Sequence, residues 1–465
     1  VFLLQYSFID KFIENNQSIH LTGIGGISMS GIASILLDKG FKVSGSDIKE
    51  NDLILKLRDD GCKINIGHSY KNIEDNVGLV VYTAAVKFDN EEIKYAIEKN
   101  IPIVSRAEFL GMLTEKYERC VTISGAHGKT TTTSMFSYVM LENNLDPTIL
   151  LGGELSIING NFRVGKSEYL LMEACEYKES FLNFSTDIGV ILNIDKDHLD
   201  YYKDLNHIKN TFKKYADKIN ERGVLIVCSD DASVMEILDS VKCRIISYGV
   251  NSGDVRAVNV RKISEGGTLF DVVYNGNLYK NIKVSVLGDH NVLNALASIA
   301  FSFACNLDFN KTKKALEDFK APKKRFEIKG KKNNITLIED YAHHPTEIKA
   351  TINTAKSITR NDIVCVFQPH TYSRTLALFD EFSKCFDGVD ELILLDIYAA
   401  REKDPGNVNS KELGDKIRSY GQKCYNAKDF EDALSYARGR IKDGDIFLTI
   451  GAGNVGNLCD MFIKS

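Results

Sequence analysis

The sequence predicts an α/β protein of three domains: a Rossmann-like domain, a central domain with a mixed sheet, and a second Rossmann-like domain. Short β-branched runs alternate with helical patterns along almost the whole chain, which is typical of βαβ units and parallel sheets. The length of 465 residues also favours about three domains rather than one core. We place the three domains at residues 1–112, 113–322 and 323–465.

The composition excludes several classes of protein. With 44% hydrophobic and 26% charged residues and only 6 prolines, every third of the chain can bury a core. The formal net charge of -5, without a basic block, argues against a nucleic-acid partner. No apolar run reaches the roughly 18 residues of a membrane span. The 10 cysteines form no CxxC pair, so we expect reduced thiols in a cytoplasmic protein.

The first domain begins with four expected strands and one clear helix. The strands are Ser18–Thr22, Phe41–Ser44, Lys63–Ile66 and Leu79–Tyr82, and the helix covers Ser30–Lys39. Parallel strands with helical crossovers bring the carboxyl ends of the strands to one edge of the sheet. We therefore expect the ligand of this domain to bind at that edge.

A glycine-rich loop follows the first of these strands. Its glycines allow backbone N–H groups to approach a diphosphate, so we predict a nucleotide or nucleotide-sugar site; an ordinary strand-to-helix turn is the alternative. A dinucleotide fingerprint would need glycine where this chain has Ser28, so NAD is not the expected ligand. Asp47, at the end of the second strand, is placed to bind a ribose hydroxyl. The other candidates are Gly23, Gly25, Gly26, Met29 and Ser30.

The central domain has a second series of strands and a phosphate-binding loop. We expect strands at Cys120–Ser124, Tyr169–Glu173, Ile188–Ile194 and Val224–Val227, and antiparallel hairpins between about Val255 and Leu287. A glycine loop, a lysine and hydroxyls directly after the first strand predict a P-loop ATPase-like domain. The loop is a shortened variant, and it predicts ATP binding without defining the reaction. Its residues are Gly125, Ala126, His127, Gly128, Lys129, Thr130 and Thr131.

Two later strand ends offer partners for a cation at that loop. Glu173 closes one strand and His198 follows another, so both could join Thr130 in a Mg²⁺ site. A helix-capping role is the alternative for His198. Further along, His290, Asn291 and Asn294 open a helix and could face a base or a phosphate, although a simple capped helix explains them equally well.

The third domain carries a concentration of reactive polar residues. We expect strands at Ile335–Glu339, Ile363–Phe367, Leu392–Leu395 and Ile446–Ile450, and a helix at Glu347–Ile358. Polar segments follow the first two strands and predict a site for an amino-acid carboxylate and for phosphates; a zinc site is the competing interpretation. The candidates include Asp340, Tyr341, His343, His344, His370 and Arg374, with Arg325 near the domain junction as a phosphate ligand or a solvated charge.

Seven motifs in this order resemble the Mur ligase family over nearly the whole chain. They are Ile24–Gly31, Gly125–Thr131, Glu173–Glu176, Asp197–Asp200, His290–Ala295, His343–Glu347 and Gln368–Thr375. The sequence departs from the usual family pattern at Cys175, Tyr177 and Thr371, where members often have Asp, Ser and a second Arg. The last change leaves Arg374 as the clearer partner for an amino-acid carboxylate.

The resemblance implies an ATP-dependent ligase that joins L-alanine to UDP-N-acetylmuramate through an acyl phosphate. It implies that the glycine loop and Asp47 bind the UDP-sugar, and that Tyr341, His344 and Arg374 bind the amino acid. It further implies Mg²⁺, or Mn²⁺ in its place, on Thr130, Glu173 and His198. The resemblance assigns ATP to the 125–131 loop with His290, Asn291, Asn294, Arg325 and Asp340, and the catalytic roles to Lys129, Glu173, His198, His344 and Arg374.

Three other functions remain open from the sequence. A sister ligase that attaches a recycled tripeptide would share most of the motifs. An NAD-dependent oxidoreductase is opposed by Ser28 and by the phosphate loop. A nucleotide switch without catalysis would need the same loop. We expect a monomer or a weak homodimer without a membrane partner.

Overall fold

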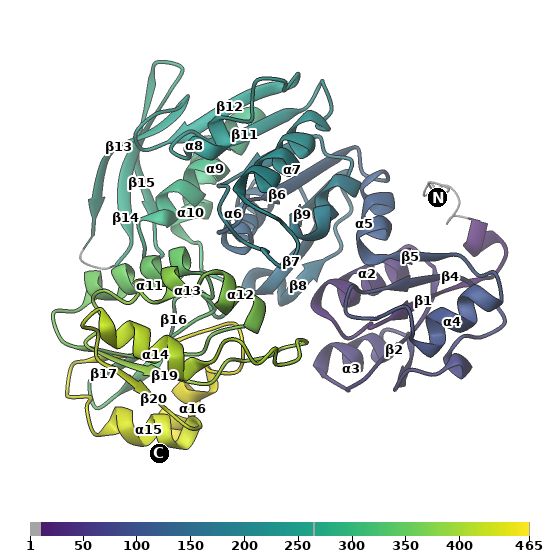
Figure 1. Cartoon of the computed structure of the whole chain (residues 1–465). Helices are drawn as coiled ribbons and strands as arrows, with labels where there is room; N and C mark the ends of the chain where they lie inside the picture. The colour runs from purple at the N-terminus through teal and green to yellow at the C-terminus, as the bar shows by residue number, and fades with distance from the viewer. Residues whose placement is uncertain (1–10, 264–265, 465) are drawn as a thin grey trace. The chain divides into compact units, whose positions relative to one another are not determined.

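The computed structural model describes residues 11–263 and 266–464 and divides into two compact units (Figure 1). Each unit combines segments that are distant in the sequence. The first unit contains Val1–Ile194, Lys209–Val255 and Ala297–Ala315, and the second contains Asp195–Ile208, Arg256–Leu296 and Leu316–Ser465.

The first unit begins with a five-stranded parallel sheet in the order β3-β2-β1-β4-β5. This order confirms the Rossmann-like expectation, since the chain turns back at β1 and continues on its other side with β4. The strands are β1 (Ser18–Thr22), β2 (Lys42–Asp47), β3 (Lys63–Ile66), β4 (Val77–Tyr82) and β5 (Ile103–Ser105). The helices are α2 (Ile27–Asp38), α3 (Asp52–Asp59), α4 (Glu91–Glu98) and α5 (Arg106–Thr114), with a short 3-10 turn η1 (Tyr70–Asn72).

A second sheet of the first unit runs in the order β12-β11-β10-β6-β9-β7-β8. Its strands pair in parallel except β7 with β8, so the sheet is mixed as expected. The strands are β6 (Arg119–Ser124), β7 (Thr148–Leu155), β8 (Gly160–Arg163), β9 (Tyr169–Glu173), β10 (Ile188–Ile191), β11 (Val224–Cys228) and β12 (Arg244–Gly249). The helical elements are α6 (Lys129–Glu142), η2 (Ser156–Ile158), η3 (Tyr177–Asn183), α7 (Leu205–Asp217), α8 (Ala232–Met235), α9 (His290–Ala304) and α10 (Phe309–Glu317), of which α7, α9 and α10 extend across the unit boundaries.

The second unit contains a six-stranded sheet in the order β16-β17-β21-β18-β19-β20, parallel except for β16. The strands are β16 (Glu327–Lys332), β17 (Ile335–Asp340), β18 (Ile363–Phe367), β19 (Glu391–Leu394), β20 (Cys424–Asn426) and β21 (Ile446–Ile450). The helices are α11 (Pro345–Ile358), α12 (Tyr372–Ala377), α13 (Phe379–Phe382), α14 (Ser410–Ser419), α15 (Phe430–Arg438) and α16 (Asn457–Lys464).

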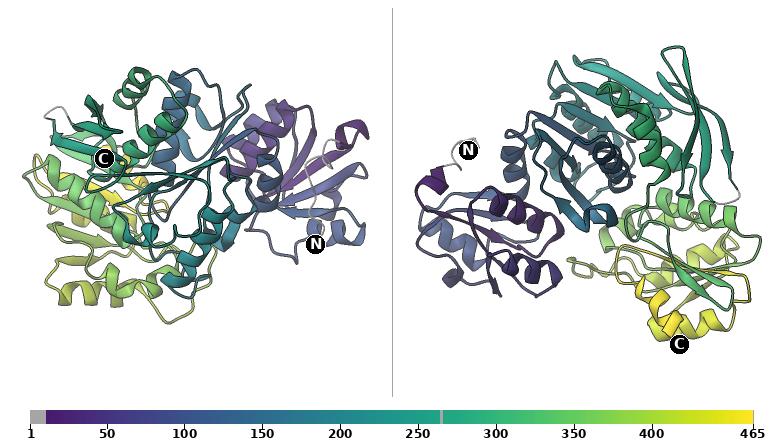
Figure 2. Two further views of the ribbon diagram at one scale, coloured as in Figure 1. Left: turned by 90° about the horizontal axis from the view of Figure 1, so that it is seen from above. Right: turned by 180° about the vertical axis from the view of Figure 1, so that it is seen from behind.

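Alternating side chains of this sheet bury two cores, one on each face. On β18, Cys365 and Phe367 pack with residues of α11, α13 and α14, whereas Val364 and Val366 pack with α15 and α16. Figures 1 and 2 show helices covering both faces of this yellow-green sheet. A strand buried on both faces reads as a continuous apolar run, which is why Ile363–Phe367 was predictable to the residue.

The expected hairpins form β13 (Val255–Lys262), β14 (Thr268–Tyr274) and β15 (Asn277–Val284). Asn275 and Gly276 connect β14 to β15 and both have positive φ, 48° and 75°, as a tight hairpin turn requires. One expected strand was too long: β10 ends at Ile191 and not at Ile194, because the chain turns there to bind the phosphate loop.

The structure gives the state of the cysteines and the lengths of the apolar helices. All ten cysteines lie in the described part of the chain as free thiols, and most are buried, as expected. Among the residues described, no helix is both long and apolar enough to cross a bilayer.

Candidate functional site

The phosphate loop joins β6 to α6 in the first unit. Gly125 and Gly128 have φ of 142° and 83°, which favour glycine, and Gly128 is the residue that caps α6. Helix α6 therefore begins at Lys129, with its N-terminus at the loop. This is the arrangement that binds phosphate at a helix N-terminus.

Asn193 holds this loop from the neighbouring strand end. The Asn193 side chain accepts a hydrogen bond from His127 N at 2.8 Å and donates one to His127 O at 3.1 Å, while Asn193 O accepts from Ala126 N at 3.2 Å. These bonds explain the early end of β10. Asn193 was not among the predicted site residues, although its place shortly after a buried parallel strand was a usable signal.

Lys129 lies at the centre of the loop with an acidic partner. Its ammonium donates to Gly125 O at 2.5 Å and to Ala126 O at 3.2 Å, and it lies 3.0 Å from the nearer carboxylate oxygen of Glu176. The side chains of Lys129 and Glu176 are only 15% and 3% exposed. The buried lysine charge is therefore balanced by Glu176, which lies outside the loop and was not among the predicted site residues.

Thr130 and Glu173 lie at the same edge of the sheet. Strands β6 and β9 are adjacent and parallel, with Ile123 opposite Glu173, and Thr130 follows in the first turn of α6. The Glu173 carboxylate accepts a hydrogen bond from Gly152 N at 2.6 Å. His198, the third residue of the expected metal set, belongs to the second unit.

The glycine loop of the N-terminal sheet leads from β1 into α2. Gly25 N donates to the Asp47 carboxylate at 2.9 Å, so Asp47 fixes this loop to the end of β2. Gly23 has a φ of 86°, and a Cβ atom there would lie 2.5 Å from Thr83 Cγ2. The side chains of Met29 and Ser30 are buried, and those candidates face the protein interior.

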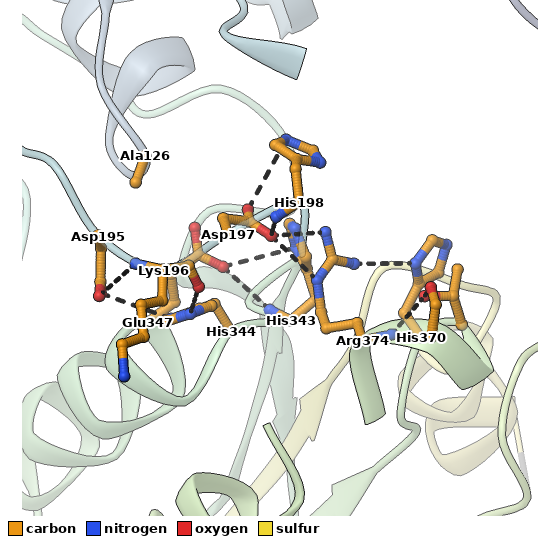
Figure 3. Close-up of polar contacts among 12 residues, drawn as sticks. Ala126, Asp195, Lys196, Asp197, His198, His343, His344, Glu347, His370 and Arg374 are labelled. Carbon is orange, nitrogen blue, oxygen red and sulfur yellow. Dashed lines mark hydrogen bonds and ion pairs between the residues drawn. The ribbon is translucent and has the colours of Figure 1, made fainter. Parts of the chain in front are cut away.

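In the second unit, the Arg374 side chain binds Asp197, in the segment of residues 195–198. Its Nη2 and Nε donate to Asp197 Oδ1 at 3.1 and 3.3 Å, and its Nη1 lies 3.4 Å from His370 Nδ1 (Figure 3). Burial raises the Asp197 pKa, but interactions with the neighbouring His198 imidazole and with the guanidinium charge of Arg374 outweigh burial, and the pKa falls well below its usual range. Asp197 is therefore an ionised and well-paired carboxylate.

His344 holds the same segment from the start of α11. Its Nδ1 accepts from Thr346 N at 3.2 Å as the helix cap, so Nε2 carries the proton and donates to Lys196 O at 2.9 Å. Thr346 Oγ1 adds a hydrogen bond to Asp195 at 2.8 Å. Figure 3 shows the His344 and Arg374 side chains beside residues 195–198. The structure gives His344 a positioning role, with both ring nitrogens in use.

His343 and His370 line the same polar cluster as uncharged groups. Burial lowers the pKa of both imidazoles, and the nearby guanidinium charge of Arg374 lowers it further, to about 4 for His370. The His370 ring also stacks on Tyr398 with centroids 5.7 Å apart. The cluster therefore combines a guanidinium, a carboxylate and two neutral imidazoles.

Asp340 closes β17 and organises the turn before β16. Its carboxylate accepts from Ala342 N and Phe326 N, both at 2.7 Å. Burial raises its pKa to about 6 against the opposing charge of Arg325. Arg325 lies over the Tyr341 ring at 5.3 Å from the centroid. Asp340, Arg325 and Tyr341 thus form one connected group.

In the first turn of α9, the side-chain amides of Asn291 and Asn294 are hydrogen bonded to each other. Asn294 Nδ2 donates to Asn291 Oδ1 at 3.0 Å, and Asn291 Nδ2 donates to Leu287 O at 2.6 Å. Both side chains are buried. The two amides therefore lie on one helix face, while His290 precedes them at the exposed start of the helix.

Models of known protein families match three consecutive parts of the chain. Three models match in order: "Mur ligase family, catalytic domain" at residues 18–118, "Mur ligase middle domain" at 123–302, and "Mur ligase, glutamate ligase domain" at 324–453. The chain belongs to the Mur ligase family.

Among individual relatives, the chain is similar to curated UDP-N-acetylmuramate--L-alanine ligases. The protein of that name from Clostridium tetani is 54% identical over 453 residues, covering 97% of this chain and 99% of the relative. The one from Clostridium perfringens is 52% identical over 455 residues, covering 98% and 99%. Both relatives are matched along almost their full length.

Solved structures show the same fold. The UDP-N-acetylmuramate-alanine ligase of Thermotoga maritima superposes with a TM-score of 0.80 at 30% identity, covering 96% of this chain and 98% of that one. A murein peptide ligase from Psychrobacter arcticus has a TM-score of 0.72 at 23% identity, over 96% and 98% of the two chains. The second match supports the fold alone.

Proposed function

We infer that the chain catalyses ATP-dependent amide-bond formation between L-alanine and the muramyl carboxylate of UDP-N-acetylmuramate, with ADP and phosphate as the other products. This is a step of peptidoglycan biosynthesis. The observation that carries the inference is the 54% identity to a ligase of this name over 99% of its length. The buried Lys129 in a glycine loop supports it with the chemistry that ATP requires.

The reaction has two chemical steps. The muramyl carboxylate attacks the γ-phosphorus of ATP, ADP leaves, and an acyl phosphate forms. The alanine amine then attacks the acyl carbon, phosphate leaves, and the amine loses a proton. The first step brings together anionic groups, so cationic and N–H donors must stabilise the transferring phosphoryl group. We assign this task to Lys129 and to the N-terminus of α6.

The Glu176 carboxylate is an ionic partner of Lys129. The two groups lie 3.0 Å apart in a site that is largely removed from water. A bound triphosphate is a stronger competitor for the ammonium group, because it presents more negative charge. We propose that Lys129 exchanges Glu176 for the phosphates when ATP binds.

The oxygen donors at this edge fit a divalent cation. Thr130 and Glu173 follow adjacent parallel strands, and hydroxyl and carboxylate oxygens are ligands that Mg²⁺ accepts. We propose that Thr130, Glu173 and His198 hold Mg²⁺, or Mn²⁺ in its place. Such an ion neutralises phosphate charge when it is bound.

We propose that the remaining substrates bind at the other loops described above. The glycine loop from Gly23 to Ser30 and Asp47 would bind the UDP-sugar, and Tyr341 and Arg374 the alanine carboxylate. His343 and His370 are uncharged at neutral pH, the protonation state that a proton acceptor needs. We also propose a cytoplasmic location, where the ten free thiols remain reduced.

A coupled phosphate-release assay tests the proposal by omitting each substrate in turn. Release should require ATP, UDP-N-acetylmuramate and L-alanine together, and Lys129→Ala should reduce it at least a thousandfold, as expected for the loss of a charge that stabilises the transferring phosphoryl group. Lys242→Ala, at a 76% exposed lysine, is the matched control and should retain full activity. Turnover with a muropeptide tripeptide but not with L-alanine would instead identify the recycling ligase.

A further inference from the structure

A buried polar network in the N-terminal sheet has no role in the mechanism above. Its centre is Glu92, which is fully buried in the first turn of α4. Five groups donate hydrogen bonds to its carboxylate: Thr22 Oγ1 at 2.9 Å, Ser46 Oγ at 2.7 Å and His20 Nε2 at 3.3 Å to Oε2, and Asn72 Nδ2 at 2.7 Å and Ser69 N at 3.4 Å to Oε1. Such saturation of one carboxylate fixes every donor around it.

The network extends to His68 through Ser46. His68 Nδ1 lies 2.9 Å from Ser46 Oγ, and 3.6 Å from Glu92 Oε2. Burial would raise the Glu92 pKa, but the hydrogen bonds and charge of His20 and the hydrogen bonds of Asn72 and Ser46 lower it to about 2. Glu92 is therefore an ionised carboxylate at neutral pH, and it can only accept hydrogen bonds.

The hydrogen bonds from His68 through Ser46 to Glu92 form a relay. The protons available in this relay define the tautomer of His68. The Ser46 hydroxyl has one hydrogen, and the bond to Glu92 uses it. Ser46 Oγ must then accept from His68, so the proton of the neutral imidazole sits on Nδ1. The other ring nitrogen, Nε2, carries a lone pair and acts as an acceptor.

The acceptor nitrogen of His68 is available to a ligand. Within the described residues Nε2 has no hydrogen-bond partner, and it is not one of the buried polar atoms that lack a partner. The His68 side chain is 19% exposed, whereas Glu92 is 0% exposed. His20 differs, because Ser44 and Glu92 occupy both of its nitrogens.

The sheet order places His68 where a nucleotide base would lie. In this fold the diphosphate binds at the loop after β1 and the ribose at the end of β2, so the base extends toward β3. Asp47 ends β2, and His68 follows β3 by two residues. The path from the Gly23 loop through Asp47 therefore leads to His68.

We propose that His68 Nε2 reads the base of the nucleotide-sugar by accepting a hydrogen bond from the N3–H of uracil, and that Ser46 and Glu92 are positioning residues that keep this nitrogen an acceptor. The inference rests on the proposed function and adds its base specificity. Uracil presents N3–H as a donor, whereas neutral cytosine presents N3 as an acceptor. An acceptor nitrogen therefore favours uridine over cytidine nucleotides.

The tautomer is tested directly by ¹⁵N–¹H NMR of the histidine rings in the full chain, with His68→Gln used to assign the signals. We expect His68 as the Nδ1–H tautomer, with an Nε2 resonance that moves when UDP binds. Ser46→Ala removes the acceptor for that proton and should populate the Nε2–H form. Ser44→Ala is the matched control on the same strand and should leave the His68 tautomer unchanged. An Nε2–H tautomer in the unmodified protein, or no change in Ser46→Ala, overturns the relay.

Specificity is tested by calorimetric binding of UDP, CDP and N3-methyl-UDP. The unmodified chain should bind UDP roughly tenfold or more tightly than the other two, since each leaves the Nε2 lone pair unpaired. His68→Ala should bring the three affinities together. An unchanged ratio in His68→Ala, while UDP-N-acetylmuramate still supports phosphate release, overturns this inference alone. Absence of substrate-dependent phosphate release in the unmodified chain would overturn the proposed function instead.

Discussion

Replacing Glu92 with glutamine should make the stability of the N-terminal sheet less dependent on pH. Glutamate has an ordinary pKa of about 4.5, and in the folded chain the pKa of Glu92 is about 2. A depressed pKa means that the carboxylate stabilises the fold above pH 4.5 and that this contribution is lost as the pH falls through 2. The full difference corresponds to about 3 kcal/mol, of which about 2 kcal/mol disappears between pH 5 and pH 3.

Hydrogen exchange of the β1 and β2 amides measures this effect. The chain has two units, so a single unfolding free energy for the whole molecule is not well defined, whereas local exchange reports on one sheet. The ratio of exchange rates between Glu92→Gln and the unmodified chain, taken at the same pH, should fall about thirtyfold from pH 5 to pH 3.

A neighbouring glutamate provides the control for this experiment. Glu91 is exposed in the same turn of α4, and Glu91→Gln should leave the exchange of β1 and β2 unchanged at both pH values. A constant ratio between Glu92→Gln and the unmodified chain over this range would refute the argument. It would mean that the network does not hold Glu92 as a low-pKa carboxylate.

Three further predictions concern other contacts. Arg374→Met leaves Asp197, whose side chain is 8% exposed, without its guanidinium; exchange in residues 195–204 should rise about thirtyfold, equivalent to about 2 kcal/mol, and phosphate release should fall in parallel. Asp340→Asn removes a carboxyl whose pKa of about 6 makes its ionisation costly, so the protection of the β17 amides against hydrogen exchange should fall less between pH 5 and pH 8 than in the unmodified chain; an equal fall in both would contradict this. Gly111→Ala places a Cβ 2.4 Å from Asn183 O and should raise the exchange rate of the α5 amides about tenfold; unchanged exchange would contradict this.

Local patterns predicted the strands and the loops that follow them. β1, β3, β9, β18 and β21 have the predicted bounds, because each is a short apolar or β-branched run between polar or glycine residues. The three-residue β5 was missed, since so short a run has no readable period. Strands β7 and β8 were missed for a different reason: Gly152 and Gly153 interrupt the apolar run of β7, and β8 contains a single apolar residue, Phe162.

Side-chain partners were much less predictable. Glu92 and His20 are 72 residues apart, and Arg374 and Asp197 are 177 apart, so neither pair leaves a local signal. A motif identifies which loop carries the chemistry, whereas the partners that set its charge and protonation come from distant strands.

The discontinuity of the second unit limits how the chain can be divided for experiments. A fragment that begins at Leu316 would contain the whole six-stranded sheet but would lack Asp195–Ile208 and Arg256–Leu296. Arg374 and His344 would then lose Asp197 and Lys196, the groups that they bind. Such a fragment could fold and still bind no substrate. Complementation would therefore require that residues 195–208 be supplied in trans as a peptide, and recovery of binding by that peptide would measure what this short insertion contributes.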